Sequence, residues 1–308
     1  MPEPLQLPDG ITLFERGWLS SNNILVKGPV SCALIDSGYA THAAQTLALV
    51  QATLRGQPLD RLLNTHLHSD HCGGNAALQA CYPRLQTLIP PGQAAFVADW
   101  NPAALSYTPT GQRCTPFTFN ATLQPNTNIE LGDQLWQIHA APGHDPSSVI
   151  LFEPLSRLLL SADALWENGF GVVFPELDGE GAFAEVAQTL DLIESLDVKT
   201  VIPGHGPAFA EVPAALARAR KRLDTFVNDP AKHIRYAAKV LIKFKLLEVQ
   251  HIDFAALLAW ARATQLVAQV HQANTSPVSF EVWVDQLVTE LVRSGAATRE
   301  QTTVHNAN

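Results

Sequence analysis

One polar turn, Thr65-His66-Leu67-His68-Ser69-Asp70-His71-Cys72-Gly73-Gly74-Asn75, organises the rest of this sequence. A mostly apolar run at residues 59–63 precedes it and predicts a strand. An alanine-rich run at residues 75–80 follows it and predicts a helix. Three histidines and an aspartate therefore lie on a strand-to-helix turn, where side chains from one short segment can converge.

The spacing of these polar residues predicts metal binding. Alternate residues of an extended segment point the same way, so His66 and His68 can bind one ion. Asp70 and His71 lie past the bend and can face a second ion nearby. Imidazole nitrogen and carboxylate oxygen are ligands that suit zinc and similar first-row metals.

The alternative is that these histidines are ordinary packed or solvated residues, and His42, His251 and His305 need no other explanation. A core would not tolerate so many adjacent polar groups without partners. A helix-based zinc motif would space its histidines four residues apart, whereas His66 and His68 are two apart. The metal interpretation is therefore favoured.

The pattern His66-x-His68-x-Asp70-His71 resembles the signature of the metallo-β-lactamase superfamily, and the resemblance extends over roughly residues 11 to 210. Four further elements of that family occur in the expected order, and five motifs in register make the resemblance specific. They are Ile35-Asp36-Ser37-Gly38, the residues around His144 in Ala141-Pro142-Gly143-His144, Asp163 in Leu160-Ser161-Ala162-Asp163, and His205 in Pro203-Gly204-His205-Gly206.

The resemblance implies a dinuclear site in which a hydroxide bridges two divalent transition-metal ions. Zinc is the expected metal, with iron or manganese as alternatives. Asp163 would bridge both ions, and Asp70 would also orient the attacking hydroxide. Asp36 is either a supporting group that hydrogen-bonds a ligand histidine or a turn residue. The implied ligands are His66, His68 and His144 for the first ion and Asp70, His71 and His205 for the second.

The order of elements predicts an α/β (α+β) fold. Strand, helix, strand and ligand recur in both halves of the sequence, which predicts two face-to-face sheets with helices outside and the ligands at one edge. In terms of the resemblance, this is a four-layered αββα sandwich of the metallo-β-lactamase type. We expect a catalytic domain over residues 1–212 and a helical C-terminal module over residues 213–308.

The C-terminal module is expected to be nearly all helix, with helices at 214–228, 231–250, 254–272 and 280–294, and its last part resembles a winged-helix end. Nine of the 20 basic residues lie between Arg218 and Lys245. Helical spacing puts four of them on one stripe, with Tyr236 on the same side. That stripe is a solvated face, a binding surface for an anionic substrate, or the partner of an acidic surface on the same chain. Its members are Lys232, Arg235, Lys239 and Lys243.

Composition describes an ordinary globular protein, with 308 residues, 46% hydrophobic and 16% charged. The net charge of −9 argues against general coating of nucleic acid.

We expect a cytoplasmic protein, because residues 1–10 do not resemble a secretory signal, no apolar run reaches about 20 residues, and the four cysteines form no disulfide framework. Cys72 either approaches the metals or packs as a small apolar residue, and packing is favoured. The oligomeric state is open, with a homodimer as a plausible state.

The loop at residues 101–116 is Pro-, Thr- and Gly-rich and long enough to frame a binding site. We place Asp99, Trp100 and Tyr107 near the pocket mouth, with plain surface packing as the alternative.

Hydrolysis is the expected reaction, and three functions remain open. The favoured one is hydrolysis of a small thioester, lactone or other acyl substrate, with an anionic substrate left open. The second is a ribonuclease or phosphodiesterase whose basic helical module binds phosphates, which the net charge disfavours. The third is a non-catalytic or redox binding module. The complete ligand set argues against catalytic silence, and the flavodoxin domain of the oxygen-reducing branch is not expected here.

Overall fold

The structure is a computed structural model that describes residues 5–273 and 278–307. The chain divides into two compact units. The first contains Met1–Leu105 and Arg113–Leu223, and the second contains Ser106–Gln112 and Asp224–Asn308. The boundary expected at residues 212/213 coincides with the start of helix α8 (Val212–Asn228), but most of this helix belongs to the first unit. One of its contacts there is the ion pair of Arg220 with Asp191 of helix α7 (Phe183–Ser195), at 2.7 Å.

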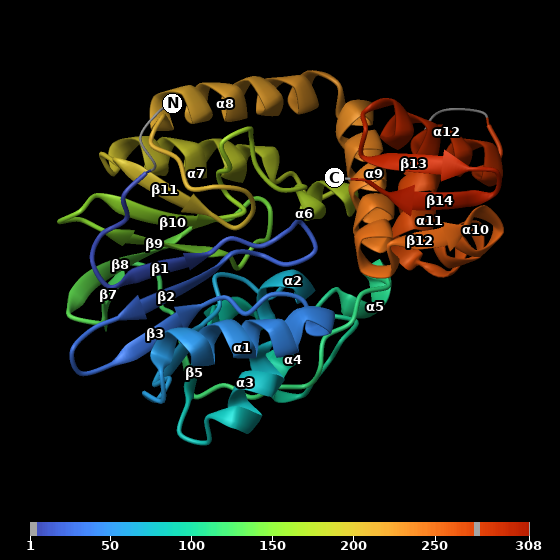
Figure 1. Cartoon of the computed structure of the whole chain (residues 1–308). Coiled ribbons are helices and arrows are strands. Elements are labelled where there is room, and N and C mark those ends of the chain that lie inside the picture. Colours follow the sequence, from blue (N-terminus) through green and yellow to red (C-terminus); the bar gives the residue numbers. More distant parts are fainter. Residues whose placement is uncertain (1–4, 274–277, 308) are drawn as a thin grey trace. The chain divides into compact units, whose positions relative to one another are not determined.

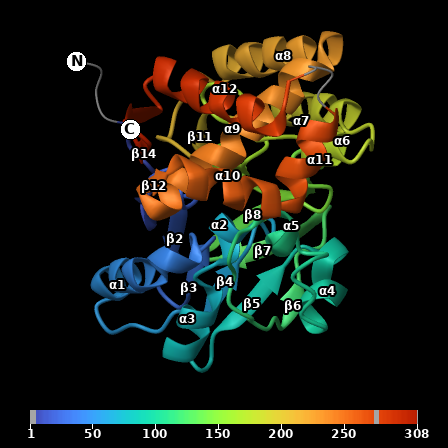
Figure 2. The same ribbon diagram turned by 90° about the vertical axis from the view of Figure 1, so that its right-hand side faces the viewer.

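A six-stranded sheet forms one half of the first unit. Figure 2 shows most of its strands side by side, and the pairs among the first three strands are antiparallel while the remaining pairs are parallel. In spatial order the strands are β1 (Ile11–Phe14), β2 (Asn23–Lys27), β3 (Cys32–Ile35), β4 (Arg61–Leu63), β5 (Gln86–Ile89) and β6 (Ala121–Thr122).

A five-stranded sheet forms the other half. Only the pair β10–β11 is parallel, and the other neighbours are antiparallel. In spatial order its strands are β11 (Thr200–Pro203), β10 (Leu158–Ala162), β9 (Val149–Glu153), β8 (Gln134–Ala140) and β7 (Thr127–Leu131).

The core explains why the strands of the first sheet are apolar on both faces. Ile24 and Val26 of β2 join a buried cluster drawn from both sheets, whereas Leu25 joins a second cluster with helices α1 (Ala43–Leu54) and α3 (Asn75–Cys81). Figure 1 shows α7 (Phe183–Ser195) and α8 covering the outer side of the other sheet. The four layers, helix, sheet, sheet and helix, confirm the predicted αββα sandwich.

Short helical segments connect these layers within the first unit. They are η1 (Ala40–His42), α2 (Ser69–Cys72), η2 (Pro91–Gln93), α4 (Ala94–Ala98) and α6 (Phe174–Leu177).

The second unit is helical but also contains a three-stranded sheet, which corrects the expectation that almost all of it is helix. The sheet order is β12-β14-β13, and the hairpin β13–β14 follows the last helix, as in a winged-helix end. The helix expected at 254–272 is two helices, because Thr264 adopts an extended conformation between them. The elements are α5 (Tyr107–Thr110), α9 (Pro230–Val249), β12 (His251–Asp253), α10 (Phe254–Ala263), α11 (Gln265–Ala273), α12 (Phe280–Arg293), β13 (Ala297–Glu300) and β14 (Thr303–Asn306).

Within the described parts of the chain, no helix has the length and apolar character that crossing a membrane would require.

The backbones of the two sheets lie close together where the turn after β2 meets the turn between β7 and β8. A Cβ atom added at Gly28 would lie 2.5 Å from backbone atoms of Gly132. We predict that Gly28→Ala lowers the free energy of unfolding by about 1–3 kcal/mol, because backbone atoms of the second sheet must move. Gly181→Ala is the matched control, since nothing lies within 4 Å of its added Cβ. Urea unfolding of both variants measures the difference, and equal stability of the two would contradict the prediction.

Candidate metal centre

The predicted ligands lie where strands of both sheets end. His66 and His68 lie between β4 and α2, and Asp70 and His71 lie on α2 itself. Strands β10 and β11 are parallel, so the segments that follow them leave the sheet at the same edge. The remaining ligand positions follow strands of the second sheet, with His144 after β8, Asp163 after β10 and His205 after β11.

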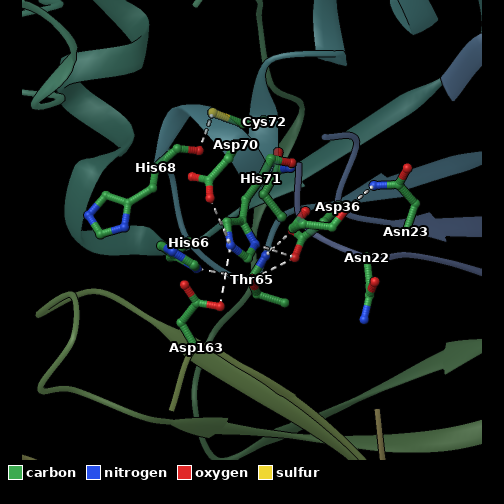
Figure 3. A network of polar contacts seen from close by, with 12 residues as sticks. Asn22, Asn23, Asp36, Thr65, His66, His68, Asp70, His71, Cys72 and Asp163 are labelled. Carbon is green, nitrogen blue, oxygen red and sulfur yellow. Dashed lines mark hydrogen bonds and ion pairs between the residues drawn. The ribbon is translucent and has the colours of Figure 1, made fainter. Parts of the chain in front are cut away.

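All seven predicted ligands come together. Their ligand atoms form three groups, and within each group the atoms lie within 4.8 Å of one another. Figure 3 shows several of these side chains pointing toward one another. The groups are His66, His68 and His144; His66, His71 and Asp163; and Asp70, His71 and His205.

Hydrogen bonds on the outer side of the rings orient two of the histidines. Asp36 Oδ2 lies 2.8 Å from His71 Nδ1, and the carbonyl oxygen of Val172 lies 2.6 Å from His144 Nδ1. These contacts leave the Nε2 atom of each ring to face the cluster. Asp36 is itself fixed by Thr65, whose amide and hydroxyl both donate to its carboxylate.

Two buried nitrogen atoms fit a metal ion. His66 Nε2 and His71 Nε2 have no hydrogen-bond partner within the described structure. The Oδ1 atom of Asp163 lies 3.5 Å from His71 Nε2, which is an ion-pair distance at the limit of a hydrogen bond. Buried polar atoms normally have partners, and a divalent cation would supply one for both rings.

The pKa values of the clustered histidines also favour a metal site. Burial lowers the pKa of His66 and His68, with neighbouring imidazoles adding to the effect, and the pKa of His68 falls to about 3. Burial also disfavours a charged His71, but Asp163, Asp36 and Asp70 outweigh it and raise its pKa well above the usual range. Three carboxylates thus converge on one buried ring, a concentration of negative charge that dications would balance.

Burial raises the pKa of Asp163, but the imidazoles of His205 and His71 reverse this and hold the pKa well below its usual range. Asp70 behaves similarly, since His71 and His205 together outweigh the effect of burial and lower its pKa. Both carboxylates are therefore in the ionised form that binds metals.

Glycines allow the backbone to approach the ligands. A Cβ atom at Gly204 would lie 2.2 Å from Asp163 Oδ1, and one at Gly171 would lie 2.3 Å from His144 Nδ1. The paired glycines of the motif allow close approach to the backbone that follows β3. A Cβ at Gly73 would lie 2.3 Å from the amide of Ala40, and one at Gly74 would lie 2.5 Å from the carbonyl of Ser37.

A polar segment before β2 holds two ligand loops together, and it was not predicted from the sequence. The amide of Ser21 donates to the carbonyl of Asp70 at 2.9 Å, and the amide of Asn22 donates to the carbonyl of Gly204 at 2.6 Å. The Asn22 side chain also donates to the carbonyls of Pro203 and Gly206. The signal in the sequence was the run Ser20-Ser21-Asn22-Asn23, which is unusually polar for the start of a buried strand.

Aromatic rings flank the cluster, and these too were missed. The Trp18 ring stacks on His205 with centroids 5.3 Å apart, and 51% of the residue is exposed. Trp166 lies edge-on to both rings and donates from Nε1 to Asp163 Oδ1 at 3.2 Å. Phe174 lies edge-on to His68 with centroids 5.0 Å apart. No spacing in the sequence connects these aromatic residues to the ligands.

The residues expected at a pocket mouth lie on or beside short helices. Tyr107 is buried on α5, which belongs to the second unit, and Trp100 packs edge-on against Phe117. Asp99 ends α4. Their placement at a pocket mouth stays a prediction.

The basic stripe makes its contacts inside the second unit. Arg235 Nε and Lys239 Nζ lie 2.8 Å and 3.1 Å from carboxylate oxygens of Glu290 on α12, and Tyr236 lies beside Phe226. Lys243 donates to the carbonyls of Ala296 and Ala307 and to the side chain of Asn306. Lys232 pairs with Asp229 at 3.4 Å. An acidic partner on the same chain, one of the three alternatives, accounts for Arg235 and Lys239, and their binding of a substrate stays a prediction.

A sequence profile of the metallo-beta-lactamase superfamily matches residues 16–205. The chain belongs to this superfamily.

Among curated proteins, the chain is 25% identical over 223 residues to the type A flavoprotein fprA of Rhodobacter capsulatus, covering 66% of this chain and 48% of that one. It is 27% identical over 185 residues to the hydroxyacylglutathione hydrolase of Shewanella baltica (strain OS223), covering 60% of each. The chain thus spans about half the length of the curated relatives it matches, 48% to 60% for these two.

Among solved structures, a metallo-beta-lactamase family protein from Thermus thermophilus aligns with 98% of this chain and 100% of its own, at a TM-score of 0.61 and 17% identity. That likeness is one of fold. TTHA1623, solved in a di-iron-bound form, is 26% identical at a TM-score of 0.54 and covers 68% of this chain and 98% of its own.

We predict that Trp166→Phe lowers metal affinity by about tenfold, because Asp163 loses the N–H group that orients its carboxylate. Trp18→Phe is the matched control, since that ring also lies beside His205 but contacts it by stacking. Chelator competition with zinc measures both affinities. Equal affinities of the two variants would show that the indole N–H of Trp166 does not position Asp163.

Proposed function

We propose that the chain is a dinuclear metal-dependent hydrolase that acts on a small thioester, lactone or other acyl substrate. The observation that carries this proposal is the arrangement of two ligand triads on either side of one carboxylate. His66, His68 and His144 form one triad, Asp70, His71 and His205 form the other, and Asp163 groups with a histidine of each. Relatives named hydroxyacylglutathione hydrolase support an acyl substrate.

Zinc is the proposed metal because imidazole and carboxylate ligands suit it. The di-iron-bound form of TTHA1623 supports iron as the alternative, and manganese fits the same ligand types.

Two bound divalent ions would acidify a water molecule, polarise the acyl oxygen and stabilise the leaving group. Residues of the protein orient the attacking water and the ligands. Asp70 is the proposed catalytic residue, because its side chain is 14% exposed whereas His71 is completely buried. Its carboxylate would accept a hydrogen bond from the attacking water and hold it in line with the acyl carbon. Asp36 keeps His71 in place through the Nδ1 contact.

The flanking aromatic rings favour a substrate with an apolar or planar portion. Trp18 offers an exposed ring beside His205, and Phe174 lies beside His68 on the other side. The phosphodiester alternative draws less support, because Arg235 and Lys239 are already paired with Glu290. A cytoplasmic location and a homodimer are part of the proposal only as predictions from the sequence.

We predict close to two transition-metal ions per chain after purification without chelators, because seven ligands are more than one ion needs. Metal analysis by mass spectrometry measures the content, followed by titration with zinc, iron or manganese. A content that stays near zero after added metal would overturn the dinuclear proposal.

The same metal-loaded protein is then screened on thioesters, lactones, β-lactams and phosphodiesters. Turnover confined to phosphodiesters would favour the alternative function.

We predict that Asp163→Asn and His68→Ala abolish hydrolysis of any substrate found by the screen while the fold persists. Neutralising Asp163 removes charge that balances two dications, so metal content should fall with activity. His251→Ala is the control, because this exposed histidine lies on β12 in the second unit. Circular dichroism, metal analysis and kcat are measured on all three variants. Wild-type kcat with full metal content in either ligand variant would contradict the assignment.

A further inference from the structure

Two cysteines lie in contact next to the metal motif. The Sγ atoms of Cys72 and Cys114 are 3.8 Å apart, although the residues are 42 positions apart in the sequence. Cys72 ends α2 directly after His71 and is buried, while Cys114 is half-buried. The other two cysteines occupy different elements, with Cys32 on β3 and Cys81 on α3.

Tyr39 and Ala40 contact the chain next to both cysteines. The amide of Arg113 donates to the hydroxyl of Tyr39 at 3.1 Å, which anchors the segment that carries Cys114. The backbone of Tyr39 and Ala40 also lies against Gly73, the residue after Cys72, so closely that no Cβ fits there. Both cysteines are therefore held against the same part of the chain, and both lie within the first unit.

A disulfide needs its sulfur atoms about 2 Å apart, so the pair must close by roughly 2 Å. Closure therefore requires rotation about χ1 of Cys114, the half-buried partner, and a shift of the chain after Arg113, which Tyr39 anchors. The Cys72 thiol donates at present to the carbonyls of His68 and Leu67, at 3.3 Å and 3.5 Å. A thiol is a weak hydrogen-bond donor, so the loss of these two bonds opposes disulfide formation only slightly.

We propose that Cys72 and Cys114 form a redox-modification site that a hydroperoxide converts into an intramolecular disulfide. The proposal is independent of the hydrolytic function. The disulfide joins α2, the helix that carries Asp70 and His71, to Cys114. Cys114 lies in the first unit, two residues after the segment Ser106–Gln112, which belongs to the second unit.

The chemistry balances with a hydroperoxide as the only oxidant. The thiolate of Cys114, the accessible partner, attacks one peroxide oxygen and forms a sulfenic acid, and the O–O bond breaks to release the alcohol or water. The Cys72 sulfur then attacks the sulfenic sulfur, and water leaves with the Cys72 proton. The two thiols lose two hydrogen atoms, and hydrogen peroxide becomes two molecules of water. In a reducing compartment such a disulfide is transient, as expected of a redox-sensing pair.

The test uses the full-length, metal-loaded protein and hydrogen peroxide at a small molar excess. Free thiols are then alkylated, and the protein is digested without reductant and mapped by mass spectrometry. The expected result is one cross-linked peptide that contains Cys72 and Cys114, with two of the four thiols lost and both restored by dithiothreitol.

Two single variants make the test specific. In Cys114→Ser, Cys72 should stay reduced at the same peroxide dose, because its buried thiol no longer has an accessible cysteine beside it. Cys81→Ser, which removes another half-buried cysteine, should form the Cys72–Cys114 link at the wild-type rate. The proposal is overturned if Cys72 and Cys114 are both recovered alkylated while Cys81 is oxidised. It is also overturned if each is found as a separate sulfinic or sulfonic acid with no cross-link.

Discussion

The first unit depends on one arrangement of charge, a completely buried imidazole surrounded by three carboxylates. His71 faces Asp36, Asp70 and Asp163, and together they offset the cost of burying its charged form and raise its pKa well above the usual range. Each carboxylate comes from a different part of the chain, so the fold must bring the ends of β3 and β10 to the helix α2. The two-sheet sandwich meets this requirement, because the strands that precede these residues end at one edge.

Close backbone approach is the second constraint. The ligand loops meet at distances that leave no room for a Cβ atom at Gly204 or Gly171, and Gly73 and Gly74 let α2 lie against the chain after β3. Asn22 and its neighbour then join the loop of Asp70 to that of His205, so ligands from both sheets share one hydrogen-bonded support. Rigidity of this kind keeps a metal site in its productive geometry.

The sequence predicted the sandwich because strands and helices leave local patterns. The resemblance to the superfamily supplied His144, Asp163 and His205, and the structure brings them close to the histidine motif, while metal binding by the cluster stays a prediction. Histidines two residues apart next to paired glycines identify His66 to His71, and the buried strand β3 (Cys32–Ile35) is a continuous apolar run. Trp18 and Trp166 were missed because their role depends only on tertiary contact with His205. Tyr107 was placed by loop length alone, although its helix packs against α11, which comes far later in the sequence. The helix expected at 254–272 failed at Thr264, since apolar periodicity continues across the break.

The chain passes between its two units three times, at Leu105, at Gln112 and at Leu223. A helical module joined only to the end of the first unit would need a single junction. Here α5 lies between two parts of the first unit in the sequence, yet it packs with α11 of the second unit. A truncation after Leu223 would therefore remove the packing partner of α5 and leave this short helix exposed within the remaining chain. The first unit is for this reason not separable from the second by one cut in the chain.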